Sequence, residues 1–276
     1  MTARSSSFRL CMGSVLLVAC ISAFFYPVLG FDFVQWDDDI NVTQNPLITA
    51  PPSWELFGDF FSGEAAQRFK PLHWMVLRAI HDGFGLNPAA FHAVGWAFHS
   101  LAAGLLFVTL RKTLHIGFEQ EGTRLDVVAW AGAALWAIHP LRVEPVAWVT
   151  GSTYPMAAVF LLGSFLAYLR AYDTGAKKNR WLAIAWLGAI AAYATYPVSA
   201  TYGLWLMAVD KGLLKIAPSP LGDGGKRKLG HGGSSRLFSS GPPSCWSRAR
   251  SGRAFIHRGS SAMPRPWGLC RGMSEC

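Results

Sequence analysis

Several long stretches of this chain carry almost no charge, and they constrain its fold more than any other feature. Only 15% of the 276 residues are Asp, Glu, Lys or Arg, whereas about a quarter of the residues in a typical soluble protein are charged. Apolar residues collect instead in uncharged segments of about 15 to 25 residues, and about 20 such residues in an α-helix cross a bilayer. Because one buried core helix cannot explain several such segments, we expect a polytopic membrane protein.

The apolar segments predict an all-α fold with about six transmembrane helices. Pro197 lies near the centre of the stretch 181–214, which is too long for one crossing, so this stretch is expected to form two short helices joined by a turn. A signal peptide is the alternative for the first segment, but its apolar residues continue from Cys20 to Gly30, which favours an uncleaved span. The other four predicted spans are residues 10–30, 88–110, 127–141 and 154–169.

Basic residues are concentrated on alternate loops, and this distribution predicts the orientation. Lys and Arg favour cytoplasmic loops. The basic groups are Arg4 with Arg9, Arg111 with Lys112 and Arg124, residues 170–180, and Lys211 with Lys215. The acid-rich loop 31–87, residues 142–153 and the turn near Tyr196 would then face the opposite side.

The composition changes abruptly at Pro218. Ten of the residues from there onward are Lys or Arg and two are acidic, so the tail contributes +8 of the net charge of +9. Its Gly, Ser and Pro content predicts disorder. We divide the chain into a multi-span membrane domain, 1–217, and a low-complexity basic tail, 218–276. The tail is interpreted as the product of a frameshift or gene-model error that truncates the protein, or else as a segment that binds anionic lipid.

The composition also limits the partners. The body of the chain is nearly neutral and lacks a basic patch with interleaved aromatic residues, so no nucleic-acid partner is expected. The five cysteines have no metal-ligand spacing, and no metal site is predicted from them. His92 and His99 can share one helical face, but a packed polar contact is favoured over a metal site.

Two polar clusters border the predicted outward side. Asp37, Asp38 and Asp39 follow the first span, and their mutual repulsion favours proton uptake by one of them, which makes it a candidate base; a solvated loop is the alternative. Around Pro140, a second cluster holds His139, Arg142 and Glu144. It either lines a polar cavity or forms an Arg142–Glu144 pair at the headgroups.

Aromatic residues of the outward loop predict a helix at the membrane surface. Trp74, Phe84 and Phe91 precede or begin the second span. Amphipathic rings favour the headgroup region, so the three side chains are expected to lie along it.

These motifs, taken in order, resemble a known family. Residues 36–46, 70–72, 84–88 and 139–149 look like the membrane half of the bacterial tetratricopeptide-repeat glycosyltransferase proteins. That group is similar to the eukaryotic transmembrane O-mannosyltransferases with tetratricopeptide repeats. The resemblance covers about residues 31–214. The chain departs from the family in having fewer spans and no 34-residue helical repeat.

The resemblance implies a GT-C glycosyltransferase of the bacterial inner membrane, with the 31–87 loop in the periplasm. Such enzymes transfer a hexose, typically mannose, from a polyprenyl-phosphate carrier to a protein hydroxyl. The resemblance assigns catalysis to Asp37 and Asp38. It implies no cofactor beyond this donor and leaves a divalent metal open. Substrate binding is expected of the remaining matched residues, which are Asp39, His139, Arg142 and Glu144.

The alternative function is that of a non-catalytic multi-span protein, which would be an inactive remnant, a scaffold or a transporter. Transporter sites lie near the bilayer midplane. The charges of this chain cluster at the predicted outer edge instead, so the sequence favours the transferase.

Overall fold

The computed structural model describes residues 3–62, 68–119, 121–173 and 177–214, which all belong to one compact unit, Met1–His231. The predicted basic tail lies outside the described residues. Within these ranges the chain is helical and has no strand, which confirms the all-α prediction. The α-helices are α1 (Ala3–Phe25), α2 (Pro46–Thr49), α3 (Trp54–Ser62), α4 (Pro71–Phe84), α5 (Pro88–Phe118), α6 (Thr123–Ala137), α7 (Val143–Ala147), α8 (Thr153–Asp173), α9 (Lys178–Thr195) and α10 (Tyr202–Gly212).

Short turns of 3-10 or π helix connect these elements. The 3-10 turns are η1 (Tyr26–Gly30), η3 (Pro140–Arg142), η4 (Thr150–Ser152) and η6 (Pro197–Thr201), and η2 (Asp39–Thr43) is a π-helical turn. Proline begins several elements, including α2, α4, α5 and η6, because a helix does not need the N–H of its first residue for an internal hydrogen bond.

Among the described residues, three segments are long and apolar enough to cross a membrane: Ser7–Gly30, Pro88–Phe118 and Thr150–Asp173. They correspond to the first, second and fourth predicted spans. The second helix was predicted to end at Leu110, but α5 continues to Phe118. Arg111 and Lys112 do not end it because their charges are paired with Asp126 and Asp173. The remaining predicted helices form as α6, α9 and α10, with 15, 18 and 11 residues.

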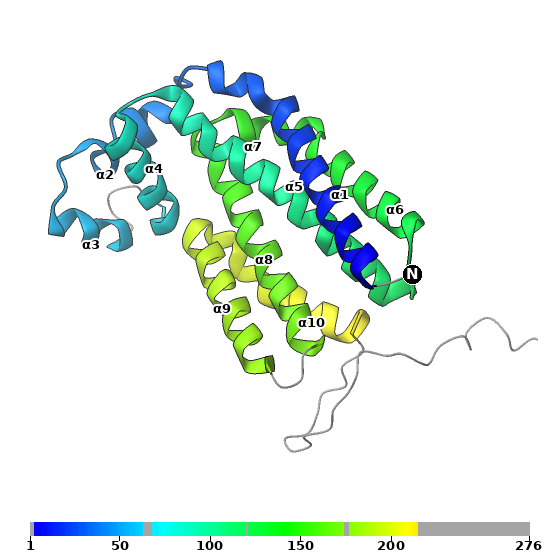
Figure 1. Ribbon diagram of the computed structural model, residues 1–276. Helices are drawn as coiled ribbons and strands as arrows, with labels where there is room; N and C mark the ends of the chain where they lie inside the picture. The colour runs from blue at the N-terminus through cyan, green and yellow to red at the C-terminus, as the bar shows by residue number, and fades with distance from the viewer. Residues whose placement is uncertain (1–2, 63–67, 120, 174–176, 215–276) are drawn as a thin grey trace, which may run out of the picture. The chain divides into compact units, whose positions relative to one another are not determined.

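Helices α1, α5 and α6 pack side by side (Figure 1). Leu17 and Ile21 of α1 are buried against Phe107 of α5, and small residues of α6 complete this core. Small side chains bring the backbones close together: a Cβ added at Gly104 would lie 2.8 Å from a methyl group of Val18.

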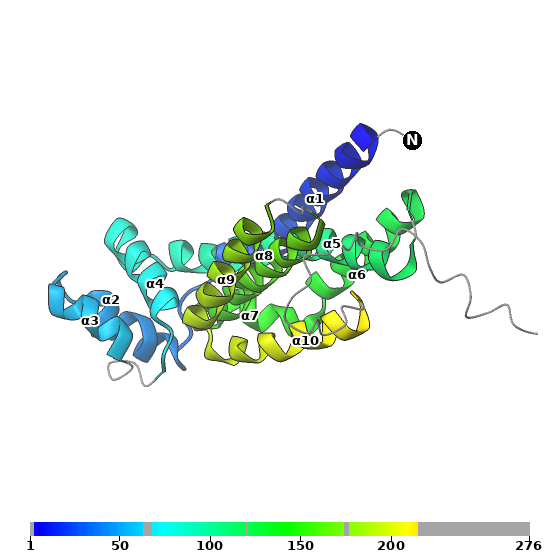
Figure 2. The ribbon, with the colours of Figure 1, turned by 90° about the horizontal axis from the view of Figure 1, so that it is seen from below.

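Helices α8 and α9 form a close antiparallel pair (Figure 1). A Cβ added at Gly188 would lie 3.0 Å from Cβ of Ser164, and the Ser164 hydroxyl donates a hydrogen bond to the carbonyl of Ala185. The break predicted at Pro197 is confirmed, because α9 ends at Thr195 and the chain turns through η6 into α10. Helix α10 runs along the lower edge of Figure 2, and its Trp205 ring packs on the Phe165 ring of α8 with ring centres 4.4 Å apart.

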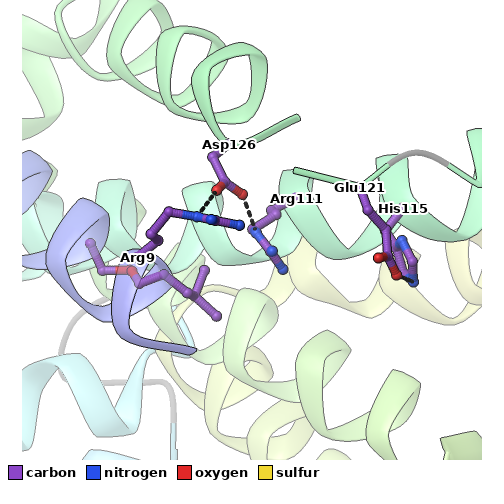
Figure 3. Close-up of polar contacts among 7 residues, drawn as sticks. Arg9, Arg111, His115, Glu121 and Asp126 are labelled. Carbon is purple, nitrogen blue, oxygen red and sulfur yellow. Dashed lines mark hydrogen bonds and ion pairs between the residues drawn. The ribbon is translucent and has the colours of Figure 1, made fainter. Parts of the chain in front are cut away.

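Charged contacts collect at the end of the bundle that holds the N-terminus. Asp126 accepts hydrogen bonds from Arg9 at 3.0 Å and Arg111 at 2.6 Å (Figure 3). Lys112 pairs with Asp173 at 2.6 Å. The loops predicted to share one side of the membrane therefore meet at one end of the structure.

Candidate active site

The described residues of the 31–87 loop fold into short helices beside the spans. Its elements η2, α2, α3 and α4 surround an apolar cluster at the end of the bundle away from the N-terminus (Figure 1). The buried members of this cluster are Val42, Leu47, Ile48, Phe60, Trp74, Leu77, Phe91 and Val149. Val149 belongs to the second outward segment, so both outward motifs contribute to one core.

The predicted surface helix through Trp74, Phe84 and Phe91 is wrong. Trp74 and Phe91 are buried in the loop's core, whereas Phe84 is 65% exposed. The three residues also lie on two helices. Gly85, with a φ of +63°, ends α4, and the Asn87 side chain then caps α5.

Asp38 is fully buried and joins the two outward motifs. Its Oδ1 accepts hydrogen bonds from the backbone N–H of Thr150 at 3.0 Å and from the Thr150 hydroxyl at 2.7 Å. Its Oδ2 accepts one from the backbone N–H of Val34 at 3.1 Å. The two contacts with Thr150 join residues 112 positions apart.

The three adjacent aspartates have different environments. Asp37 and Asp39 are half-buried. Asp39 accepts a hydrogen bond from the backbone N–H of Ile40 at 2.9 Å, so its carboxylate is used within its own turn. The negative charge of Asp37 favours the charged form of Lys70 and so opposes the lowering of the pKa of Lys70. The fold thus gives the three adjacent aspartates different surroundings.

Lys70 is buried immediately before α4, with 4% of its surface exposed. Its ammonium lies 5.9 Å from the ring centres of both Trp74 and Tyr196, close enough for cation–π attraction. Burial, reinforced by the positive charge of Arg68 and opposed by Asp37, lowers the pKa of Lys70 from 10.5 to about 8. This side chain is a cation at neutral pH in a largely apolar setting.

His73 lies fully buried one turn further along α4. Its Nε2 is 2.9 Å from the hydroxyl oxygen of Ser152, and that hydroxyl donates its proton to the carbonyl of Val149 at 2.6 Å. His73 must therefore donate from Nε2, which leaves Nδ1 as a buried acceptor without a partner among the described residues. Burial and the charge of Lys70 lower the pKa of His73 to about 3, so the ring is neutral.

The residues of the second motif do not converge on one another. His139 is exposed, and its Nδ1 accepts a hydrogen bond from the backbone N–H of Leu141 at 3.2 Å. Arg142 lies over the Trp136 ring at 5.3 Å, and Glu144 is exposed. The described residues contain no Arg142–Glu144 ion pair, so that predicted alternative is wrong.

His92 and His99 each contact the backbone of another segment. His92 lies 3.3 Å from the carbonyl of Asp32, and His99 donates to the carbonyl of Ala137 at 2.9 Å. These are the packed polar contacts favoured by the sequence. No group of three or more His, Cys, Asp or Glu in the described part of the chain is placed to hold a metal.

Four residues of this site had no predicted role, namely Lys70, His73, Thr150 and Ser152. Lys70 begins the motif 70–72, and its place in that motif was a signal that could have identified it. Thr150 and Ser152 carry no signal of their own, because hydroxyl residues at a helix start are common.

An apolar cavity of about 310 Å³ lies between α8, α9, η6 and α10. Trp186, Tyr193 and Leu206 are among the residues that line it. Tyr193 also contacts the ring of Phe69 at 5.7 Å, just before Lys70. The cavity is therefore a neighbour of the polar site and does not contain it.

Comparison with known proteins places these motifs in context. No family model matches the chain, and no solved structure matches it significantly. The chain is 31% identical to "Protein O-mannosyl-transferase TMTC1" of Homo sapiens over 172 residues, which are 59% of this chain and 18% of that protein. It is 28% identical to "Protein O-mannosyl-transferase TMTC4" of Homo sapiens over 201 residues, which are 66% of this chain and 26% of that protein.

The matched regions thus span between about a sixth and a quarter of the length of these curated relatives. The expected resemblance is therefore confirmed: the chain is similar to the eukaryotic protein O-mannosyl-transferases TMTC1 to TMTC4.

Proposed function

We propose that this chain forms part of a GT-C glycosyltransferase that moves a hexose, with mannose as first choice, from a polyprenyl-phosphate carrier to a protein hydroxyl. The similarity to protein O-mannosyl-transferases supports the reaction class. The observation that carries the site is the pair of hydrogen bonds from Thr150 to Asp38, because they bring the two outward motifs into one polar cluster.

The proposal includes six membrane crossings, with the 31–87 loop on the periplasmic face of a bacterial inner membrane. Its support is the grouping of charged loop contacts at the opposite end of the bundle. Single cysteines at Asp59 and Arg180, which are both exposed, test this orientation in intact cells. A membrane-impermeant maleimide should label Asp59→Cys before lysis and Arg180→Cys only after it. The reverse pattern would overturn both the topology and the site.

In the proposed reaction Asp37 is the base. The acceptor hydroxyl oxygen bonds to the anomeric carbon of the sugar, its proton passes to the Asp37 carboxylate, and the bond from that carbon to the carrier phosphate breaks. A hydroxyl is a poor nucleophile until a base takes its proton. Cations beside the departing phosphate offset its growing negative charge, and Lys70 and Arg142 are assigned this task.

The remaining predicted residues receive supporting roles. Asp38, to which the resemblance assigns catalysis, is proposed instead to position the loop, because its three hydrogen bonds keep its oxygens engaged. Asp39, His139 and Glu144 are proposed to border the bound substrates. The exposed positions of His139 and Glu144 leave their side chains accessible to a ligand.

Membranes that contain the chain can be incubated with labelled polyprenyl-phosphate mannose and a Ser/Thr acceptor peptide. Asp37→Asn should abolish incorporation at unchanged protein level, whereas Asp59→Asn, an identical change at an exposed site of the same loop, should not alter it. Equal incorporation by the native chain and Asp37→Asn would refute the role of Asp37. No incorporation by the native chain would favour a non-catalytic membrane protein.

A further inference from the structure

Helix α3 presents three chemically different faces. Leu56 and Phe60 face the loop's core, and Phe60 is only 7% exposed. Glu55 and Asp59 lie on a second, exposed and acidic face. The third face carries three exposed aromatic rings, which belong to Trp54, Phe57 and Phe61.

The aromatic face is continuous. Trp54 is 86% exposed, Phe57 45% and Phe61 50%. Trp54 stacks on Phe57 with ring centres 5.7 Å apart, and Phe57 contacts Phe61 at the same distance. Residues at positions i, i+3 and i+7 of a helix share one side. Removing apolar rings from water is favourable in proportion to the area removed, so leaving all three in water forgoes a large stabilisation.

We propose that α3 lies along the headgroup region of the outer leaflet, with Trp54, Phe57 and Phe61 facing the lipid. A helix in this position has the protein beside it, lipid beneath it and water above it, which accounts for all three faces. The aromatic rings suit the boundary between headgroups and acyl chains. No Lys or Arg lies on α3, so the partner is the apolar boundary itself and not an anionic headgroup.

Neighbouring surfaces support this partner. Figure 1 places α3 away from the N-terminus, towards the end of the bundle where α1 ends and α5 begins. Tyr26 and Phe31, at the end of the first span, are 64% and 50% exposed, so that span carries exposed aromatic rings up to the start of the loop. Because α3 packs on α2 and α4, its depth in the leaflet would determine the position of the 31–87 loop relative to the membrane surface.

Spin labels at single cysteines test the proposal, with the five native cysteines replaced by alanine and the full chain in liposomes. Labels at Phe57 and Phe61 should be relaxed mainly by lipid-soluble oxygen. Labels at Glu55 and Asp59 should be relaxed mainly by a water-soluble nickel chelate. Val15→Cys on α1, which is 59% exposed, provides the lipid-facing reference.

The expected result is an oxygen-to-nickel accessibility ratio several times higher on the aromatic face than on the acidic face, and below that of Val15, which lies deeper in the bilayer. Equal ratios on the two faces would overturn the proposal. Low accessibility of Phe57 and Phe61 to both reagents would also overturn it, because another protein surface would then cover them. None of these readings depends on sugar transfer, so the proposed reaction and this surface can fail separately.

Discussion

Replacing Asp38 should destabilise the junction between the two outward motifs. Its carboxylate is fully buried and accepts hydrogen bonds from the backbone N–H groups of Val34 and Thr150 and from the Thr150 hydroxyl. In Asp38→Ala all three donors lose their acceptor inside the protein. In Asp38→Asn one oxygen remains for Thr150, but the new NH2 group faces the N–H of Val34.

The size of the effect follows from the number of donors. A hydrogen bond to a charged group contributes about 1.5–3 kcal/mol, and a buried donor left without an acceptor costs about 1–3 kcal/mol. The terms overlap, so we expect Asp38→Ala to lower the free energy of unfolding by about 3–5 kcal/mol and Asp38→Asn by about 2 kcal/mol.

A double-mutant cycle isolates the contact itself. Thr150→Val removes the hydroxyl but keeps the backbone N–H, and its coupling to Asp38→Ala should be about 1–2 kcal/mol. Thr150→Ser retains the donor and serves as the control. Thermal unfolding of the purified protein in detergent, followed by loss of the monodisperse peak, measures each variant.

Two results would refute this reasoning. Asp38→Ala as stable as the native chain would mean that the carboxylate is not buried against Thr150. Zero coupling between the two positions, with both variants destabilised, would mean that each acts through other partners.

Further outcomes follow from other contacts. Because the pKa of His73 is lowered to about 3, the unfolded chain binds the proton more readily between that pH and about 6.5. The neutral His73 ring thus makes its full contribution to stability above pH 6.5, and this contribution falls as the pH drops. Thermal unfolding should show a smaller loss of stability between pH 7 and 5 in His73→Gln than in the native chain. Asp126→Ala removes both arginine contacts and should lower stability by about 2 kcal/mol by denaturant titration, with Asp126→Glu milder. Gly188→Ala should lower the unfolding temperature because its Cβ would crowd Ser164, whereas Gly163→Ala, with open space around it, should not.

The helical framework was predictable because its signals are local. The break at Pro197 depends on one residue that lacks an N–H, and the apolar segments have a composition that few other structures share. The end of α5 was not predictable in the same way. Arg111 and Lys112 interrupt the apolar stretch of the sequence and so suggest that the helix ends there. The residues that pair with them, Asp126 and Asp173, lie on other helices and are not visible in the local sequence.

The candidate site was only partly predictable for a related reason. Three adjacent aspartates are equivalent in the sequence, and the donors that select Asp38 for burial come mainly from Thr150, on a distant segment. Trp74 and Phe91 looked like surface anchors because aromatic rings suit both a membrane interface and a core. The rings that do remain exposed, on α3, belong to a stretch that the sequence analysis did not single out.

The first loop is held in place by residues far along the chain: Thr150 binds Asp38, Ser152 binds His73, and Tyr196 lies beside Lys70. A synthetic peptide of residues 31–87 lacks all three supports. Antibodies raised against such a peptide should therefore recognise the denatured chain on a blot and fail to bind the native protein, and selection of binders for this loop requires the intact helical bundle as antigen.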